Sequence, residues 1–239
     1  MWKGDAMAST QRSLVRLLAA AALTLSVAGC SGDGGSSSGS VDEVLSDAAQ
    51  TLSQTEGVSL DLATKALPSG VAGITRATGV VTSAPAFEGE LTVMYGGINA
   101  NVPLIAVDGT VYAQLPFTPS FDEVDPSEYG APDPSTLIAA DSGFPALLDE
   151  TSEATKGDEV RGGENNSEVL TTYSGTVPGS AMSAIIPSAT GDFDVEWQIA
   201  DSGELRSAEL TGTFYPDSEE MTYTVTFSDY GTSQEIVAP

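Results

Sequence analysis

The sequence predicts an α+β fold in which helices cover the concave face of a curved antiparallel half-barrel sheet. Most of the chain after residue 57 alternates apolar and polar residues with a period of two, as antiparallel strands with one dry face do. A few short segments between the strands are too apolar to be exposed and need a surface to cover. Because large antiparallel sheets twist and curl, we expect these helices on the concave side.

A secretory leader precedes this domain. Arg12 and Arg16 stand before an apolar run over residues 17–27, which is followed by small residues and Cys30. This is the order of a signal peptide, and the run is shorter than the about 20 residues that a membrane-spanning helix needs. We therefore expect residues 1–29 to be a signal peptide, with the start at Met1 or Met7.

Cys30 is the predicted lipidation site. Val27-Ala28-Gly29-Cys30 matches the bacterial lipobox, in which the cysteine thiol receives a diacylglyceryl group and the residue becomes the new N-terminus. The alternative is an ordinary signal peptide that is cleaved near an incidental cysteine. Residues 30–39 then form a Gly/Ser-rich tether that behaves as flexible coil, and residues 40–239 form a single domain.

Composition excludes several classes of function. The chain has 34 acidic and 8 basic residues, and the part after the leader carries a net charge of −28. Such a field repels phosphate groups, so we expect no nucleic acid partner and no electrostatic adsorption to membranes. The chain has no histidine and one cysteine, which removes the Ser-His-Asp triad, the commonest metal ligand and any internal disulfide.

The elements follow in order along the chain. A helix is predicted from a capping box at Ser40 and Glu43 to Gly57, with an apolar stripe on one face. Strands are expected over residues 58–63, 74–83 and 90–95, then a hairpin over 102–115 that turns at Asp108-Gly109. A proline-rich, acidic surface loop over 116–134 is expected next.

The second half repeats this alternation of helices and strands. Asp133-Pro134 predicts a helix start, followed by one or two short apolar helices up to Leu148. Strands are expected over residues 152–162 and 167–177, and a short helix over 178–186. The clearest pattern is a meander of three strands over 193–199, 208–214 and 221–228.

Several of these segments resemble the LppX/LprA/LprF/LprG family of actinobacterial lipoproteins. The resemblance runs from Cys30 to the C-terminus and lies in the order and spacing of short motifs. They are the lipobox, the tether, the first helix, Val107-Asp108-Gly109-Thr110-Val111-Tyr112-Ala113, Asp133-Pro134, residues 157–163, Tyr173-Ser174-Gly175-Thr176-Val177 and Val225-Thr226-Phe227-Ser228-Asp229-Tyr230-Gly231.

The resemblance implies a half-barrel similar to the LolA/LolB carriers, with a cavity for acylated lipids or glycolipids. It further implies an extracytoplasmic protein that is anchored to the outer leaflet of the plasma membrane through Cys30 and works beside a membrane exporter. It places Leu91 and Val93 on a cavity-lining strand. With the alternating pattern, the candidates for the cavity wall are Leu60, Leu62, Leu91, Val93, Ile105, Val107, Val111, Leu137, Leu147, Leu148, Met182, Ile185, Val195, Trp197, Ile199, Val225 and Phe227.

The sequence allows three other interpretations besides a lipid cavity. The same apolar residues can form a solid core, which would suit an adhesion or scaffold lipoprotein without a ligand. Asp192, Asp194 and Glu196 suggest calcium, but a strand without a loop cannot wrap an ion, so a solvated face is expected. Paired carboxylates can hydrolyse glycosides, yet no pocket motif or nucleophile elbow singles out a pair. We therefore expect no enzyme activity, no cofactor and no metal.

Overall fold

The chain divides into two units, Met1–Ser38 and Gly39–Pro239. The structure, a computed structural model, describes residues 39–239. Its helices are α1 (Val41–Gln54), η1 (Pro126–Tyr129), η2 (Pro134–Thr136), α2 (Phe144–Asp149), η3 (Glu164–Asn166) and α3 (Gly179–Ile185). Its strands are β1 (Gly57–Ala63), β2 (Gly73–Thr82), β3 (Ala86–Tyr95), β4 (Ile98–Val107), β5 (Thr110–Ala113), β6 (Asp122–Val124), β7 (Ser152–Gly162), β8 (Glu168–Val177), β9 (Thr190–Ala200), β10 (Leu205–Thr213) and β11 (Met221–Ser228).

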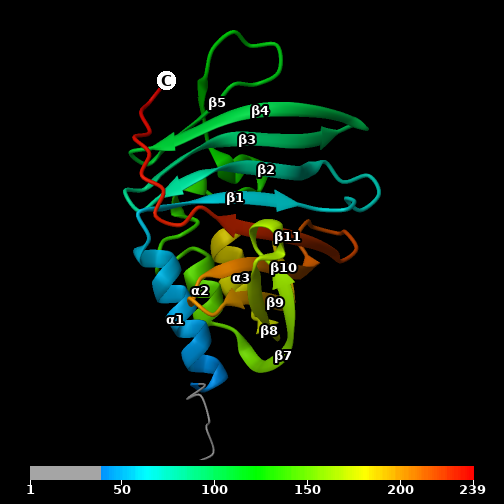
Figure 1. The fold of residues 1–239 in the computed structure, drawn as a ribbon. Coiled ribbons are helices and arrows are strands. Elements are labelled where there is room, and N and C mark those ends of the chain that lie inside the picture. Colours follow the sequence, from blue (N-terminus) through cyan, green and yellow to red (C-terminus); the bar gives the residue numbers. More distant parts are fainter. Residues whose placement is uncertain (1–38) are drawn as a thin grey trace, which may run out of the picture. The chain divides into compact units, whose positions relative to one another are not determined.

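All eleven strands form one antiparallel sheet in the order β6-β5-β4-β3-β2-β1-β11-β10-β9-β8-β7. Two meanders, β1 to β6 and β7 to β11, join where the first strand pairs with the last. Leu60 lies opposite Phe227 at this junction, and Leu62 lies opposite Val225. The sheet is open, with β6 and β7 at its edges, and it curves as shown in Figure 1. The predicted fold class, a curved antiparallel sheet with helices on one face, is confirmed.

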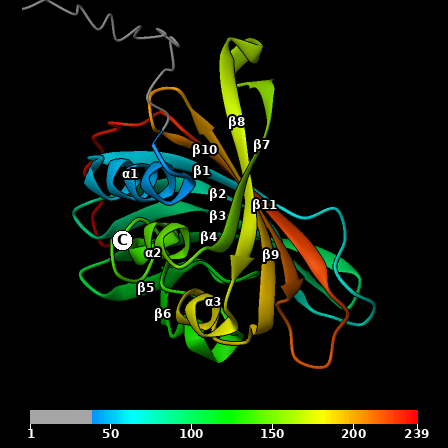
Figure 2. The ribbon, with the colours of Figure 1, turned by 90° about the horizontal axis from the view of Figure 1, so that it is seen from below.

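Helices cover part of the concave face. Helix α1 packs against α2 and also contacts β7 and β10, α3 lies on β9, and η2 lies on β2, β3 and β4. Figure 2 shows α1, α2 and α3 gathered over one end of the sheet, while strands extend past them at the other end. None of the helices described over residues 39–239 is long and apolar enough to cross a membrane.

Aromatic side chains fill the space between the helices and the strands. Trp197, Phe193, Phe214 and Phe227 are fully buried. Phe144 on α2 meets Phe227 on β11 edge to face, with ring centroids 5.1 Å apart, which ties the helix layer to the sheet. Burial of this kind is the main favourable contribution to folding in a domain whose described residues contain no cysteine.

The structure corrects the sequence-based strand bounds in the first meander. Strand β3 begins at Ala86 and β4 at Ile98, so the two form a long hairpin that turns at Gly96-Gly97. Both glycines have positive φ, as the tight turn requires. The predicted loop over 116–134 contains the short edge strand β6 and the 3₁₀ turn η1. Three residues of edge strand are too few to show an alternating pattern.

Candidate functional site

The strand register decides which side chains line the concave face. Pairing places Phe87, Leu91 and Val93 of β3 on the same face as the buried residues of β1 and β4. Phe87 is buried, and its ring lies over Gly79 and Gly89, where an added Cβ would come within 2.7 Å of the ring. These two glycines therefore let an aromatic ring lie flat on the sheet.

Most of the predicted cavity residues belong to a packed core. Eleven of the seventeen candidates are buried together: Leu60, Val111, Leu147, Leu148, Met182, Ile185, Val195, Trp197, Ile199, Val225 and Phe227. Trp197 and Met182 are 0% exposed and Leu147 is 1% exposed. Beneath α2 and α3 the concave face is thus filled by the protein's own side chains.

Four further candidates are half-buried. Leu62, Leu91, Val93 and Leu137 pack against the core from its margin. Leu62 and Leu91 share one level of the sheet, because each lies opposite Ala77 of β2. The apolar face continues from Val93 to Tyr95 and Ile98, which lie opposite each other at the hairpin tip and are exposed. We call Leu62, Leu91, Val93, Tyr95 and Ile98 the open end of the concave face.

Two candidates lie on the wrong face for this site. Ile105 is opposite Glu88 and Tyr112, and Val107 is opposite Ala86 and Thr110, so both side chains alternate away from the concave face. Ala106, which lies between them in the sequence, faces the concave side instead and is 0% exposed. The prediction for Ile105 and Val107 was wrong because a two-residue turn pairs Val107 with Thr110 and puts Val111 on the face of Ala106. Cys30, the remaining candidate, lies outside the described residues.

A pair of tyrosines that the sequence pattern does not single out borders the open end. The Tyr215 and Tyr223 hydroxyls lie 2.8 Å apart. The Tyr223 hydroxyl donates to the carbonyl of Ile74, and the Ile74 N–H donates to the Tyr215 hydroxyl at 3.3 Å. Burial, with a smaller contribution from Tyr215, raises the pKa of Tyr223, which keeps its hydroxyl protonated as a donor. This ring of hydrogen bonds holds the start of β2 against β11.

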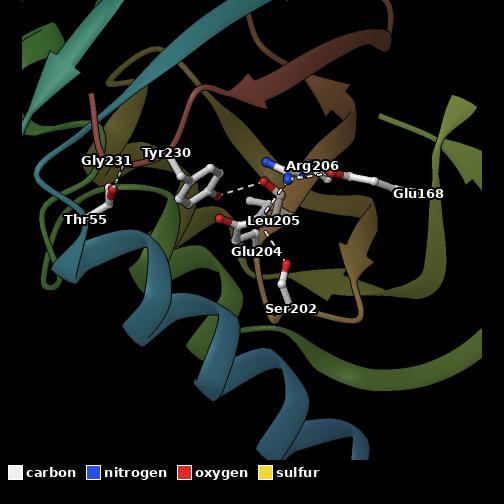
Figure 3. A network of polar contacts seen from close by, with 8 residues as sticks. All are labelled: Thr55, Glu168, Ser202, Glu204, Leu205, Arg206, Tyr230 and Gly231. Carbon is white, nitrogen blue, oxygen red and sulfur yellow. Dashed lines mark hydrogen bonds and ion pairs between the residues drawn. The ribbon is translucent and has the colours of Figure 1, made fainter. Parts of the chain in front are cut away.

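A polar network lies near the C-terminal end of α1 (Figure 3). Arg206 donates to both carboxylate oxygens of Glu168, at 2.7 and 2.8 Å, and to Glu204 at 2.8 Å. The Tyr230 hydroxyl donates to the Leu205 carbonyl, and burial raises the pKa of Tyr230. These contacts connect β8, β10 and the C-terminal segment, so their role is structural.

Two hollows lie among the helices. One of about 490 Å³ lies between α1, the end of α2 and the start of β7, and acidic residues Asp42, Asp149 and Glu153 are part of its wall. The other, of about 250 Å³, lies between α2 and α3 with Ala146, Ala181 and Ile185 in its wall. Both are open to solvent. Among the described residues, no three His, Cys, Asp or Glu side chains are placed to hold a metal ion.

Comparisons with known proteins agree on the fold. LprF from Mycobacterium bovis aligns with a TM-score of 0.67 at 17% identity, over 83% of this chain and 96% of that protein. Lipoprotein LppX from Mycobacterium tuberculosis aligns with a TM-score of 0.60 at 17% identity, over 82% of this chain and 98% of that protein. A search of curated proteins finds no match.

A family model settles the relationship that the motifs suggested. The model of the LppX_LprAFG lipoproteins matches residues 41–236, which is nearly all of the described unit. The match covers both meanders and all the helices between them. The chain therefore belongs to the LppX_LprAFG family of lipoproteins.

Proposed function

We propose that this protein is a membrane-anchored lipoprotein that binds acylated lipids or glycolipids on its concave face and carries them within the cell envelope. The observation that carries the proposal is the open end. There an apolar face that is buried elsewhere emerges half-exposed at Leu62, Leu91 and Val93. Membership of a lipoprotein family supports the same function.

Acyl chains have a physical reason to lie on this surface. Each Å² of apolar surface that a lipid and the open end remove from water contributes about 25 cal/mol. The polar head stays in water, because its transfer to an apolar surface without hydrogen-bond partners costs free energy. Deeper entry requires α2 and α3 to move away from the sheet, because Leu147 and Met182 fill that space. These helices have six and seven residues and little stability of their own.

The proposal includes the place in which the protein works. Lipid on Cys30 anchors the chain to the outer face of the plasma membrane, where a membrane exporter can act as partner. Binding and transfer of this kind need no catalytic residue and no cofactor. The net charge of −26 disfavours adsorption to anionic surfaces, so attachment depends on the acyl groups at Cys30.

A matched pair of variants tests lipid binding. Leu91→Trp fills the open end, whereas Glu90→Trp places the same ring on the outer face of the same strand, where Glu90 is exposed. We expect Leu91→Trp to lower the uptake of a pyrene-labelled phosphatidylcholine by about tenfold, the factor that corresponds to about 1.4 kcal/mol. Glu90→Trp is expected to bind like the unmodified protein. Equal uptake by both variants would overturn the proposal.

The filled core beneath α2 and α3 favours one alternative, an adhesion or scaffold lipoprotein without a ligand. In that case Leu91→Trp overpacks the margin of a solid core and costs about 1–3 kcal/mol of stability. If the open end is a binding surface, it accepts the indole ring with a smaller loss of stability than a solid core does. Urea unfolding of the same two variants therefore separates the two functions, because a solid core predicts lower stability and no lipid uptake by any form of the protein.

A further inference from the structure

Two apolar tips project from the half of the sheet formed by β3 to β6. At the β3–β4 turn Tyr95 is 78% exposed and Ile98 is 73% exposed. In the connection between β5 and β6, Phe117 is fully exposed. We call these the hairpin tip and the Phe117 tip.

The backbone holds the Phe117 ring in water at a cost. The Thr118 N–H donates to the Leu115 carbonyl at 3.0 Å, which closes a turn with Pro116 and Phe117 at its centre. Phe117 has a φ of 71°, in a position of a type II turn that usually holds glycine. A bulky residue in this conformation is strained, and strain at an exposed position suggests a role for the side chain.

Both tips lie toward the same end of the sheet. The Gln114 N–H donates to the Pro103 carbonyl at 2.9 Å, which extends the β4–β5 pairing past the end of β5. The connection between β5 and β6 therefore leaves the sheet on the side where β4 begins with Ile98. Ile98 itself belongs to the open end, so the hairpin tip is part of the surface where lipid is proposed to bind, and the Phe117 tip lies toward the same end of the sheet.

The tips are free of charge in a strongly acidic chain. Residues 91–107 and 109–121 contain no acidic or basic residue. Tyr129 differs from the two tips, because it is 67% exposed in a segment that does contain charged residues, Asp125 and Glu128. Exposed apolar side chains without neighbouring charges on their own segments suit the interface of a lipid bilayer better than water.

We propose that the hairpin tip and the Phe117 tip enter the interfacial layer of the membrane and turn the open end toward the lipids that it takes up. This rests on the proposed function and identifies its loading surface. The favoured lipid surface is zwitterionic, because an anionic one repels the acidic chain.

Tryptophan quenching by brominated lipids tests the contact. The lipidated full-length protein is reconstituted in phosphatidylcholine vesicles with brominated acyl chains, as the Phe117→Trp, Tyr95→Trp and Tyr129→Trp variants. We expect strong quenching of tryptophan at 117 and 95, about threefold or more above that at 129, because only the first two reach the acyl region. Trp197, which is 0% exposed, supplies the background signal in all variants. Equal quenching at 117 and 129 would overturn the proposal.

A second variant separates membrane contact from folding. Phe117→Gly removes the ring and relieves the positive φ, so its thermal stability should equal or exceed that of the unmodified protein. We expect the uptake of pyrene-labelled phosphatidylcholine from vesicles to slow by about tenfold, with uptake of the same lipid from detergent micelles unchanged. Slower uptake from both sources would mean that Phe117 belongs to the binding surface, and unchanged uptake from both would refute a loading role. Quenching without any lipid uptake would instead refute the proposed carrier function and leave the contact intact.

Discussion

Arg206 links the start of β8 to β10 across the intervening strand β9. Its paired hydrogen bonds with Glu168 join the start of β8 to β10, with Glu204 as a second carboxylate partner. These hydrogen bonds lower the pKa of Glu168, since they favour the ionised carboxylate over the protonated form. The same hydrogen bonds raise the pKa of Arg206, although burial of the guanidinium acts in the opposite direction.

The lowered pKa of Glu168 makes a prediction about acid stability. Its contribution is present above the unfolded pKa of about 4.3 and is lost as the pH falls through the lower folded value. Glu168→Gln should therefore lower the free energy of unfolding by up to about 1 kcal/mol at pH 7 and by less at pH 3. Urea unfolding at the two pH values measures this. Glu90→Gln, on the outer face of β3, is the control, and an equal cost at both pH values would contradict the prediction.

In the hairpin over residues 102–115, the residue pattern predicts the strands and the turn but not which face of the hairpin is buried. The alternation in residues 102–115 predicts two strands, and the Asp108-Gly109 turn forms with positive φ at both residues as expected. The pattern did not identify the inner face, because Ile105 and Val107 are as apolar as Leu104 and Ala106. Pairing with β3 decided it by placing Leu104 opposite Gly89 and Ala106 opposite Phe87.

At the scale of elements, helix α1 is the one whose start the sequence predicts best. The Ser40 hydroxyl accepts from the Glu43 N–H at 3.3 Å, and the Glu43 carboxylate accepts from the Ser40 N–H at 2.8 Å. This capping box satisfies two backbone donors that the first turn leaves unpaired. Leu45, Ala48, Ala49 and Leu52 then form the buried face. The helix ends at Gln54, three residues before Gly57.

Removal of the cap should weaken the domain measurably. Ser40→Ala is expected to lower the free energy of unfolding by about 1 kcal/mol, because a helix N-terminus loses its side-chain acceptor. Ser46→Ala, at an exposed position within the same helix, should be neutral or slightly stabilising, since alanine has the higher helix propensity. Urea denaturation of both variants gives the comparison. A Ser40→Ala protein as stable as Ser46→Ala would show that packing alone sets the start of α1.

Over the whole domain, the helices give the two halves of the concave face different properties. Where α2 and α3 cover the sheet, the side chains interlock around Trp197, whose indole N–H donates to the Thr151 hydroxyl at 3.1 Å. At the open end Leu91 and Val93 keep part of their surface in water. Apolar surface of this kind in a lipoprotein of this family is where we propose that acyl chains bind.

Anchoring and binding should be separable properties of the molecule. Cys30→Ala is expected to move the protein from the membrane fraction to the soluble fraction, because two exposed tips cannot replace covalent acyl chains on so acidic a chain. Its lipid uptake in solution should stay within about twofold of that of the lipidated protein. Fractionation by centrifugation and the pyrene-lipid assay measure the two properties. Loss of uptake in the unlipidated variant would show that anchor and binding surface are coupled.

The sequence by itself determined the periodicity of the strands, the cap of α1 and most of the turns, because each depends on residues close together in the chain. It also determined the family, because the order and spacing of motifs can be read along the whole chain. Only the tertiary structure decided which apolar residues are core and which are surface. Trp197 and Leu91 both lie on alternating strands, yet one is covered by helices and the other is not. The physical reason is that burial depends on what packs above a strand, and most of the elements that meet on the concave face, such as α1 and α2 or η2 and β3, are far apart in sequence.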